Sequence, residues 1–323
     1  MWPEALDPLL SKYLKADARS GSSRCEAASD TGSSQGARRH GMGGINISRN
    51  EQDATGVPME YEIVPATEAT MAEVEAWLDV EESIYKTAIE ALEAEGYVGD
   101  EPPRGFRCNW DSVKRTWSEG NARVDILMVE GHAVGFLDGT DILEIRPDLR
   151  REGYGRLLAD FMVDVAHNEG RSVLEIEIAP WTVEPFWKRM GFTVVPDRRG
   201  SGGGIYAYRI LHKVYSFSDG ERVSFSIQFY SEHERYRENP KPFSRFSGMG
   251  ERLSDGSVQL PERAFCFEPI HSQHGDYFVS IELGGETIHF DKVKYETSKA
   301  KGIRLDAGYT YFIDRITPQS SPD

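Results

Sequence analysis

Residues 141–170 join a short strand, a glycine-containing turn and an amphipathic helix, and this succession constrains the fold more than any other part of the chain. The apolar pattern of 141-DILEI-145 predicts a strand, which Pro147 ends. A helical pattern of apolar residues follows a few positions later. Between strand and helix stand Gly153 and Gly155, which let backbone N–H groups at the helix start approach an anion. This pattern suits a pyrophosphate.

The elements on both sides of this stretch predict a mixed sheet with helices. Runs of β-forming residues alternate with segments rich in Ala, Glu and Leu, which gives the order β-α-α-β-β-β-α-β-α-β-β. The expected strands are 61–66, 123–129, 133–139, 141–145, 173–179, 192–195 and 205–211, and the expected helices are 71–96, 111–120, one that follows the two glycines and a short one around Phe186.

A different pattern begins near Tyr215. Apolar and polar residues alternate along 223–229, and Gly284-Gly285 joins two further strand-like runs as a hairpin. The fold class is therefore expected to be α/β (α+β), with a mixed, mostly antiparallel sheet flanked by helices and a smaller all-β C-terminal domain. The expected domains are 58–214 and 215–323.

The N-terminal segment 1–57 is expected to be disordered. It has no Phe, Trp or Tyr between Lys15 and Glu60, and it is rich in Ser and Gly, so it cannot bury enough apolar surface to offset the entropy of ordering.

Composition excludes several classes of function. The formal net charge is −16, which disfavours binding to nucleic acid. The mean hydropathy is −0.50, and no apolar run reaches the roughly 20 residues that span a bilayer, so no membrane partner is expected. The three cysteines, Cys25, Cys108 and Cys266, are far apart in sequence, which favours reduced thiols and a cytoplasmic location.

The strand, loop and helix resemble the acyl-CoA loop of the GNAT superfamily of N-acetyltransferases. In that family a strand patterned L-x-V-x-P precedes R/Q-x-x-G-x-G/A and a helix. Here 143-LEIRP-147 and 150-RREGYG-155 stand at that spacing. A second landmark of the family, a short helix ending F-Y-x-K-x-G-F, is matched by 186-FWKRMGF-192. The resemblance covers about residues 60–212 and implies a GNAT-like fold there.

The resemblance implies acetyl-CoA as co-substrate and a set of residues that hold it. Backbone groups of the loop would surround the pyrophosphate, with Arg150 assisting by charge, and the strand edge at Ile145 would pair with the amides of the pantetheine arm. The implied cofactor-binding residues are Ile145, Arg150, Arg151, Glu152, Gly153, Tyr154, Gly155, Arg156 and Trp187.

Candidate catalytic residues follow from the chemistry of amine acylation. The amine must lose a proton, and a carboxylate can accept it. Glu144, Glu175 and Glu177 are the candidates, because Glu144 precedes the loop and the other two share one face of the strand 173–179.

The sequence does not single out one residue as the acid that protonates the departing thiolate. Many family members have Tyr at the position of Trp187, and an indole N–H is no useful acid. Two alternatives are open: coenzyme A leaves as the unprotonated thiolate, or a nearby tyrosine, Tyr206 or Tyr208, supplies the proton, and Tyr206 is the one included among the candidate catalytic residues.

The expected function is acetyl-CoA-dependent N-acetyl transfer to the primary amine of a small molecule or peptide. Residues 58–214 carry a net charge of −12, which favours a cationic acceptor. The alternative is a catalytically degenerate, acyl-CoA-binding regulatory protein; a toxin that acts on charged tRNA is disfavoured by the acidic balance. No metal site is expected, because His271, His274 and His289 lack a recognisable ligand set around them. Whether the chain forms a homodimer is left open.

Overall fold

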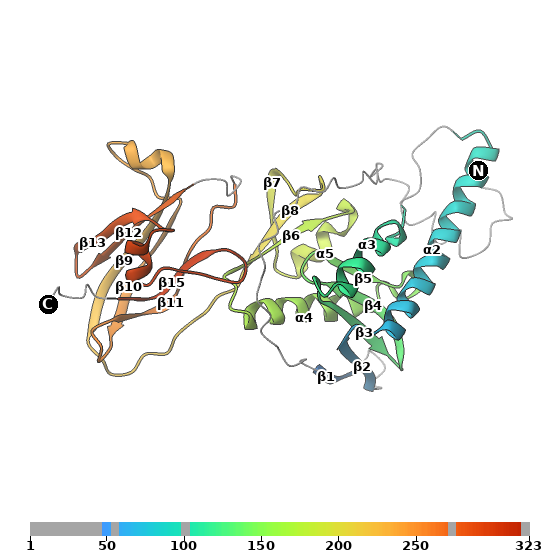
Figure 1. Cartoon of the computed structure of the whole chain (residues 1–323), viewed down its shortest axis with the longest axis horizontal. Helices are drawn as coiled ribbons and strands as arrows, with labels where there is room; N and C mark the ends of the chain where they lie inside the picture. Colours follow the sequence, from blue (N-terminus) through green and yellow to red (C-terminus); the bar gives the residue numbers. More distant parts are fainter. Residues whose placement is uncertain (1–46, 53–57, 98–103, 271–275, 318–323) are drawn as a thin grey trace. The chain divides into compact units, whose positions relative to one another are not determined.

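The computed structural model of the chain describes residues 47–52, 58–97, 104–270 and 276–317 (Figure 1). The chain divides into two compact units. Of the described residues, the first unit holds those up to 162 together with 177–190 and 201–204, and the second holds 163–176, 191–200 and those from 205 onward. The predicted borders at residues 57 and 214 stay predictions.

The first unit contains a five-stranded antiparallel sheet in the order β1-β2-β3-β4-β5. Its strands are β1 (Ile47–Gln52), β2 (Pro58–Pro65), β3 (Val124–Val129), β4 (His132–Asp138) and β5 (Ile142–Ile145). Five of the six residues of β3 are buried, as are five of the seven in β4, so both faces of these strands are covered.

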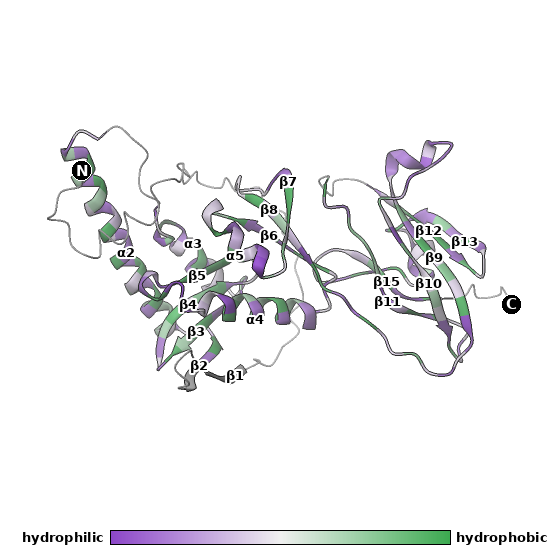
Figure 2. Cartoon of the chain, turned by 180° about the vertical axis from the view of Figure 1, so that it is seen from behind, coloured by the Kyte–Doolittle hydropathy of each residue, from purple (hydrophilic) through white to green (hydrophobic). Residues whose placement is uncertain are grey.

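Two helices pack on this sheet, α2 (Glu68–Ala94) and α3 (Arg107–Ser118). A capping box starts α2: the Thr67 hydroxyl accepts from the Thr70 N–H at 3.2 Å, and the Thr70 hydroxyl accepts from the Thr67 N–H at 2.9 Å. Figure 2 shows both hydrophobic and hydrophilic residues along α2, as expected for a helix with one buried side. That side supplies Trp77, whose ring lies 6.3 Å from Phe136 of β4.

After β5 the chain forms a further series of helices and strands. These are η1 (Pro147–Leu149), α4 (Tyr154–Asn168), β6 (Val173–Ile178), η2 (Trp181–Val183), α5 (Glu184–Arg189), β7 (Thr193–Arg199) and β8 (Ile205–Ile210). The last three strands form a separate sheet in the order β6-β8-β7, so the ladder of the first sheet ends at β5. The predicted order of strands and helices from β2 to β8 is confirmed.

One expectation for the N-terminal segment needs correction. Within residues 1–57, which were expected to be disordered, Ile47–Gln52 form β1 and pair along their whole length with β2. The unpaired backbone groups on the outer edge of β2 offer hydrogen bonds that a composition argument does not consider. The rest of that segment lies outside the described residues.

The β-rich region expected from residue 215 is confirmed in the second unit. It is a seven-stranded sheet in the order β13-β12-β9-β10-β11-β15-β14. The strands are β9 (Arg222–Ser231), β10 (Ser244–Arg252), β11 (Val258–Cys266), β12 (Tyr277–Leu283), β13 (Glu286–Lys292), β14 (Arg304–Leu305) and β15 (Tyr311–Ile316), with two short helices, η3 (Glu232–Tyr236) and α6 (Glu296–Ala300). The predicted hairpin holds, because Leu283 pairs with Glu286 across two glycines that both have positive φ.

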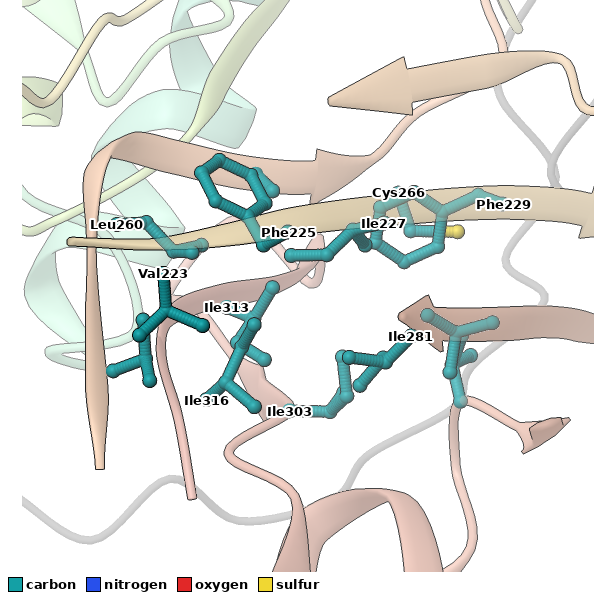
Figure 3. Close-up of a cluster of buried hydrophobic side chains, with 14 residues drawn as sticks. Val223, Phe225, Ile227, Phe229, Leu260, Cys266, Ile281, Ile303, Ile313 and Ile316 are labelled. Carbon is teal, nitrogen blue, oxygen red and sulfur yellow. The ribbon is translucent and has the colours of Figure 1, made fainter. Parts of the chain in front are cut away.

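Alternating residues of β9 build the core of this region. Phe225, Ile227 and Phe229 are buried in one cluster with Ile281 of β12 and Ile313 of β15 (Figure 3). The period of two that was visible in the sequence therefore does mark the buried face.

Residues 173–176 of β6 and the strand β8 belong to the same unit as this β-rich region and pack against it. Val173 of β6 shares a buried cluster with Phe265, Phe267 and Phe312. The Ser172 N–H also donates to the Asp306 carboxylate at 2.7 Å. Nowhere in the described ranges is a helix long and apolar enough to cross a membrane.

Candidate functional site

The loop between β5 and α4 has an unusual backbone. Arg151 has φ +74° and Gly153 has φ +95°, in the left-handed region that costs an L-residue roughly 1–2 kcal/mol. A Cβ on Gly153 would meet nothing within 4 Å, so its backbone conformation, and not lack of space, favours glycine. The two residues turn the chain sharply into the first turn of α4.

Gly155 has a different role in the same loop. It lies in the first turn of α4, and a Cβ there would be 3.8 Å from Ile145 Cγ1 and 3.8 Å from the Phe186 ring, which is ordinary contact. The side chains of Ile145 and Phe186 therefore pack against the first turn of α4 at Gly155. The first N–H groups of a helix have no partner within the helix, and the helix dipole favours an anion there.

The residues of the loop differ in their exposure to solvent. Arg151, Glu152 and Gly153 are exposed, whereas Tyr154 is buried. Burial raises the pKa of the Tyr154 phenol, with Glu152 and Glu130 adding to the effect. The exposed residues of the loop are thus followed directly by a buried residue that starts α4. Arg156, on the first turn of α4, pairs with Asp160 at 3.4 Å.

The Arg150 guanidinium is directed to three acceptors in the first unit. Its Nε donates to the Ile145 carbonyl at 3.0 Å, and its Nη2 lies 3.2 Å from Glu81 and 3.4 Å from Glu144. These contacts hold the loop against β5 and α2. The predicted role of Arg150 at the pyrophosphate stays a prediction.

Glu144 lies on β5 directly before the loop, opposite Phe136 of β4. Its side chain is 28% exposed. Burial raises the pKa of Glu144 to about 7, with Arg150 lowering it and Glu81 raising it. A carboxylate with this pKa accepts a proton readily near neutral pH.

Glu81 is a site residue that the sequence reasoning missed. Its side chain is only 3% exposed, and it packs so closely on the loop before α3 that a Cβ on Gly105 would lie 2.4 Å from Glu81 Cδ. The sequence did contain a feature that could have identified it: Glu81 follows Trp77 and Leu78 on the apolar side of α2, where an acidic residue is unexpected.

Glu177 holds a glycine-rich loop. Its carboxylate accepts from the N–H groups of Gly202 and Gly204, at 2.9 and 2.6 Å. A Cβ on Gly204 would lie 2.7 Å from Glu177 Cγ, so the close approach needs glycine. The two oxygens of Glu177 are therefore engaged in fixing the β7–β8 loop, which supports a positioning role over that of a general base.

Glu175 and Tyr206 are brought together in the second unit. The Tyr206 hydroxyl donates to Glu175, and the Arg198 guanidinium stacks over the Tyr206 ring at 3.5 Å and lies 4.0 Å from Glu175. Burial, together with Glu175, raises the pKa of the Tyr206 phenol. A buried phenol with a raised pKa is a weak proton donor, so this environment does not favour Tyr206 as the acid.

Trp187 lies half-buried on α5, edge-to-face against Phe186 at 5.0 Å between ring centroids. Trp187 therefore lies next to Phe186, the ring that packs beneath the start of α4 at Gly155. Of the predicted residues, the structure thus brings Glu144, Ile145, the loop and the α5 aromatics into one unit, while Glu175 and Tyr206 form their own cluster in the other.

No group of three His, Cys, Asp or Glu side chains within the described residues could hold a metal ion. His289 instead contacts the Ser298 hydroxyl at 2.7 Å, and His271 and His274 lie outside the described residues. Within the described residues Cys108 and Cys266 are in no disulfide, and the Cys108 Sγ donates to the Gly105 carbonyl at 3.8 Å.

Comparisons with known proteins give matches among solved structures. No model of a known protein family matches the chain. No curated protein matches it in sequence. The similar structures include a GNAT-family acetyltransferase from Staphylococcus aureus Mu50, with 11% identity over 47% of this chain and 99% of that chain, at a TM-score of 0.32.

Two further structures are similar over the same share of this chain. The PaiA N-acetyltransferase from Thermoplasma acidophilum, solved in complex with coenzyme A, has 12% identity over 46% of this chain and 98% of its own, at a TM-score of 0.33. A GCN5-related N-acetyltransferase from Rhodopseudomonas palustris has 21% identity over 46% of this chain and 94% of its own, at a TM-score of 0.30. Each of these matches leaves about half of this chain uncovered.

Proposed function

We propose that this protein is an acetyl-CoA-dependent N-acetyltransferase that acts on a primary amine. The observation that carries the proposal is the loop after β5, where positive φ at Arg151 and Gly153 turns an exposed backbone into the N-terminus of α4. A bent, solvent-facing loop at a helix N-terminus is a binding arrangement for phosphate groups.

Acetyl-CoA would bind with its pyrophosphate on the backbone of residues 151–155. The edge of β5 at Ile145 ends a sheet, since β6 belongs to a different ladder, and its backbone groups would pair with the amides of the pantetheine arm. Phe186 and Trp187 would give the apolar part of the co-substrate a surface to contact.

The chemistry needs one proton acceptor and one leaving group. The amine nitrogen attacks the thioester carbonyl, the C–S bond breaks, and the nitrogen loses a proton to Glu144, directly or through water. The raised pKa of Glu144, about 7, suits this role at neutral pH. Glu144 is therefore our choice of general base over Glu175 and Glu177, whose carboxylates accept from Tyr206 and from two backbone amides.

The leaving thiolate does not require an acid in this scheme. Trp187 has no acidic proton to give, and Tyr206 is held by Glu175 with a raised pKa. Coenzyme A would leave as the thiolate and take its proton from solvent. The net charge of −12 over residues 58–214 favours a cationic amine as the acceptor, and the spaced cysteines favour a cytoplasmic enzyme.

A second candidate function is supported by Trp187. An acyl-CoA-binding regulatory protein would keep the loop and lose the acid, as this chain does at that position. Such a protein would bind acetyl-CoA without turning it over.

One experiment separates the two candidates. The full chain is incubated with acetyl-CoA and a panel of polyamines, aminoglycosides and basic peptides, and acetylated amine is detected by mass spectrometry alongside free thiol. The enzyme produces both in equal amounts with at least one amine. Calorimetric binding of acetyl-CoA without any acetylated product across the panel supports the regulatory protein, and the absence of binding contradicts both.

A further inference from the structure

A cluster of three charged side chains links α2 to the loop and to Glu144. The Arg150 side chain, 44% exposed, extends back from the loop between two carboxylates, Glu81 on α2 and Glu144 on β5. The Arg150 Nη2 lies 3.2 Å from a Glu81 oxygen and 3.4 Å from a Glu144 oxygen, so one nitrogen serves both acids. When both carboxyl groups are ionised, the cluster has a net charge of −1.

Glu81 is fixed in this cluster. Its side chain is 3% exposed, and its carboxyl group lies so close to Gly105 that a Cβ there would require Glu81 to shift. Arg150 is a cation that pairs with this buried carboxyl group, and such a pair offsets part of the cost of burial. Because Arg150 also donates to the Ile145 carbonyl at 3.0 Å, the same contacts hold the backbone where β5 leads into the loop.

We propose that Glu81 is a positioning residue of the acetyl-transfer site, which through Arg150 fixes the start of the acetyl-CoA loop and sets the proton affinity of Glu144. The inference rests on the proposed function for its catalytic meaning. It assigns a role to Glu81 that depends on charge as well as on packing.

The sign of the coupling follows from the arrangement. Arg150 favours the charged form of Glu144, and Glu81 opposes it both by direct repulsion and by sharing the guanidinium. Removing the charge of Glu81 therefore makes Glu144 a stronger acid. Removing the charge of Arg150 makes Glu144 a weaker acid, with a higher pKa. The residue facing Glu144 across the ladder, Phe136, carries no titratable group.

A neighbouring residue gives a matched control. Glu82, next to Glu81 on the same helix, is also buried, with a side chain 9% exposed, and it pairs with Arg104 at 2.7 Å and with Lys86 at 3.6 Å. Glu82→Gln removes the same charge from the same turn of α2. It leaves the contacts of Arg150 with Glu81 and Glu144 in place.

The test is a carboxyl carbon-13 titration of the full chain labelled on glutamate. The Glu144 signal is the one that disappears in Glu144→Gln. In Glu81→Gln the midpoint of Glu144 falls by about 1 pH unit, and in Arg150→Gln it rises by a similar amount. Glu82→Gln leaves it within a few tenths of a unit of the original. The inference is overturned if Glu81→Gln moves the midpoint no more than Glu82→Gln does, or if Arg150→Gln moves it in the same direction as Glu81→Gln.

The same variants distinguish this inference from the proposed function. The titration is read on protein without co-substrate, so it reports the cluster even if no amine is acetylated. Where turnover is measurable, the acid limb of kcat/KM moves with the Glu144 midpoint, to lower pH in Glu81→Gln. A titration that shifts as expected in a protein that releases no thiol keeps the charge coupling and rejects the enzyme.

Discussion

Both carboxylate oxygens of Asp314 accept hydrogen bonds from Arg263, at 2.8 Å from Nε and 2.8 Å from Nη2. Arg263 is 4% exposed, its Nη1 donates to the Gly170 carbonyl at 2.5 Å, and its guanidinium stacks on the Phe312 ring at 3.7 Å. One side chain thus ties β11 and β15 of the β-rich region to the turn that follows α4. The bidentate ion pair joins β11 to β15 within the β-rich region, and the hydrogen bond to Gly170 together with apolar packing joins that region to the segment that leads into β6.

This ion pair is expected to contribute substantially to stability. Arg263→Ala removes a buried guanidinium, the bidentate partner of the half-buried Asp314 carboxylate and the donor to the Gly170 carbonyl, and we expect a loss of about 3 kcal/mol in the free energy of unfolding. Chemical denaturation measures the change. Arg245→Ala, at an exposed position on β10, is the control and should cost under about 0.5 kcal/mol. Equal costs for the two variants would show that the Arg263 pair does not hold the unit together.

The β7–β8 loop depends on Glu177. Glu177→Ala removes the acceptor for the N–H groups of Gly202 and Gly204, and we expect hydrogen exchange at these two amides to speed up about tenfold or more. Glu184→Ala, which removes an acid paired with Lys188 on α5, serves as the control and should leave that exchange unchanged. Unaltered protection in Glu177→Ala would mean that the loop is held by other contacts.

How much of this could be predicted from the sequence differs between fold and site. The order of elements from β2 to β8 follows from local patterns, such as the apolar stripe after Gly155 and the run of apolar residues in β3, and those patterns were sufficient. The strand β1 was missed, because its pairing depends on an edge supplied by β2 and not on its own composition.

The site was predictable only in part for the same reason. The loop around Gly153 could be predicted from the spacing of its glycines, which is a local property of the sequence. The roles of Glu81 and Glu177 depend on what lies opposite them in space: Gly105 and Arg150 for the first, the amides of a loop 25 residues or more away for the second. Spacing along the chain carries no information on such contacts.

The two glycines of the loop should respond differently to the same change. Gly153→Ala puts a Cβ on a residue with φ +95°, and we expect the affinity for acetyl-CoA to fall about tenfold as the loop relaxes. Gly155→Ala meets only ordinary contacts at 3.8 Å, and its affinity should change less than about threefold. Calorimetry measures both.

A control variant measures how much a Cβ at positive φ lowers stability at a position away from the loop. Gly96→Ala places a methyl group on a residue with φ +69° at the end of α2, with nothing within 4 Å. It should lose stability without losing affinity. If Gly153→Ala binds acetyl-CoA as tightly as Gly96→Ala does, the pyrophosphate is not held by this loop.

The pH dependence should report Glu144. A general base works in its deprotonated form, so with a pKa of about 7 for Glu144 the value of kcat/KM should rise with pH up to about 7 and fall about tenfold per unit below it. Glu144→Gln should remove this limb and slow turnover by about 10²-fold or more. An acid limb that persists in Glu144→Gln would assign the proton acceptor to another group.

The central claim, that the loop after β5 presents acetyl-CoA to an amine, is tested most directly by steady-state release of free thiol at varied concentrations of both substrates. For the unaltered chain the account predicts a rate that saturates with acetyl-CoA and with the amine and is negligible when the amine is omitted. The Gly153→Ala chain should need about tenfold more acetyl-CoA for the same rate, while Gly96→Ala behaves as the unaltered chain. Thiol release that does not depend on any amine, or that is equal in Gly153→Ala and the unaltered chain, would contradict it.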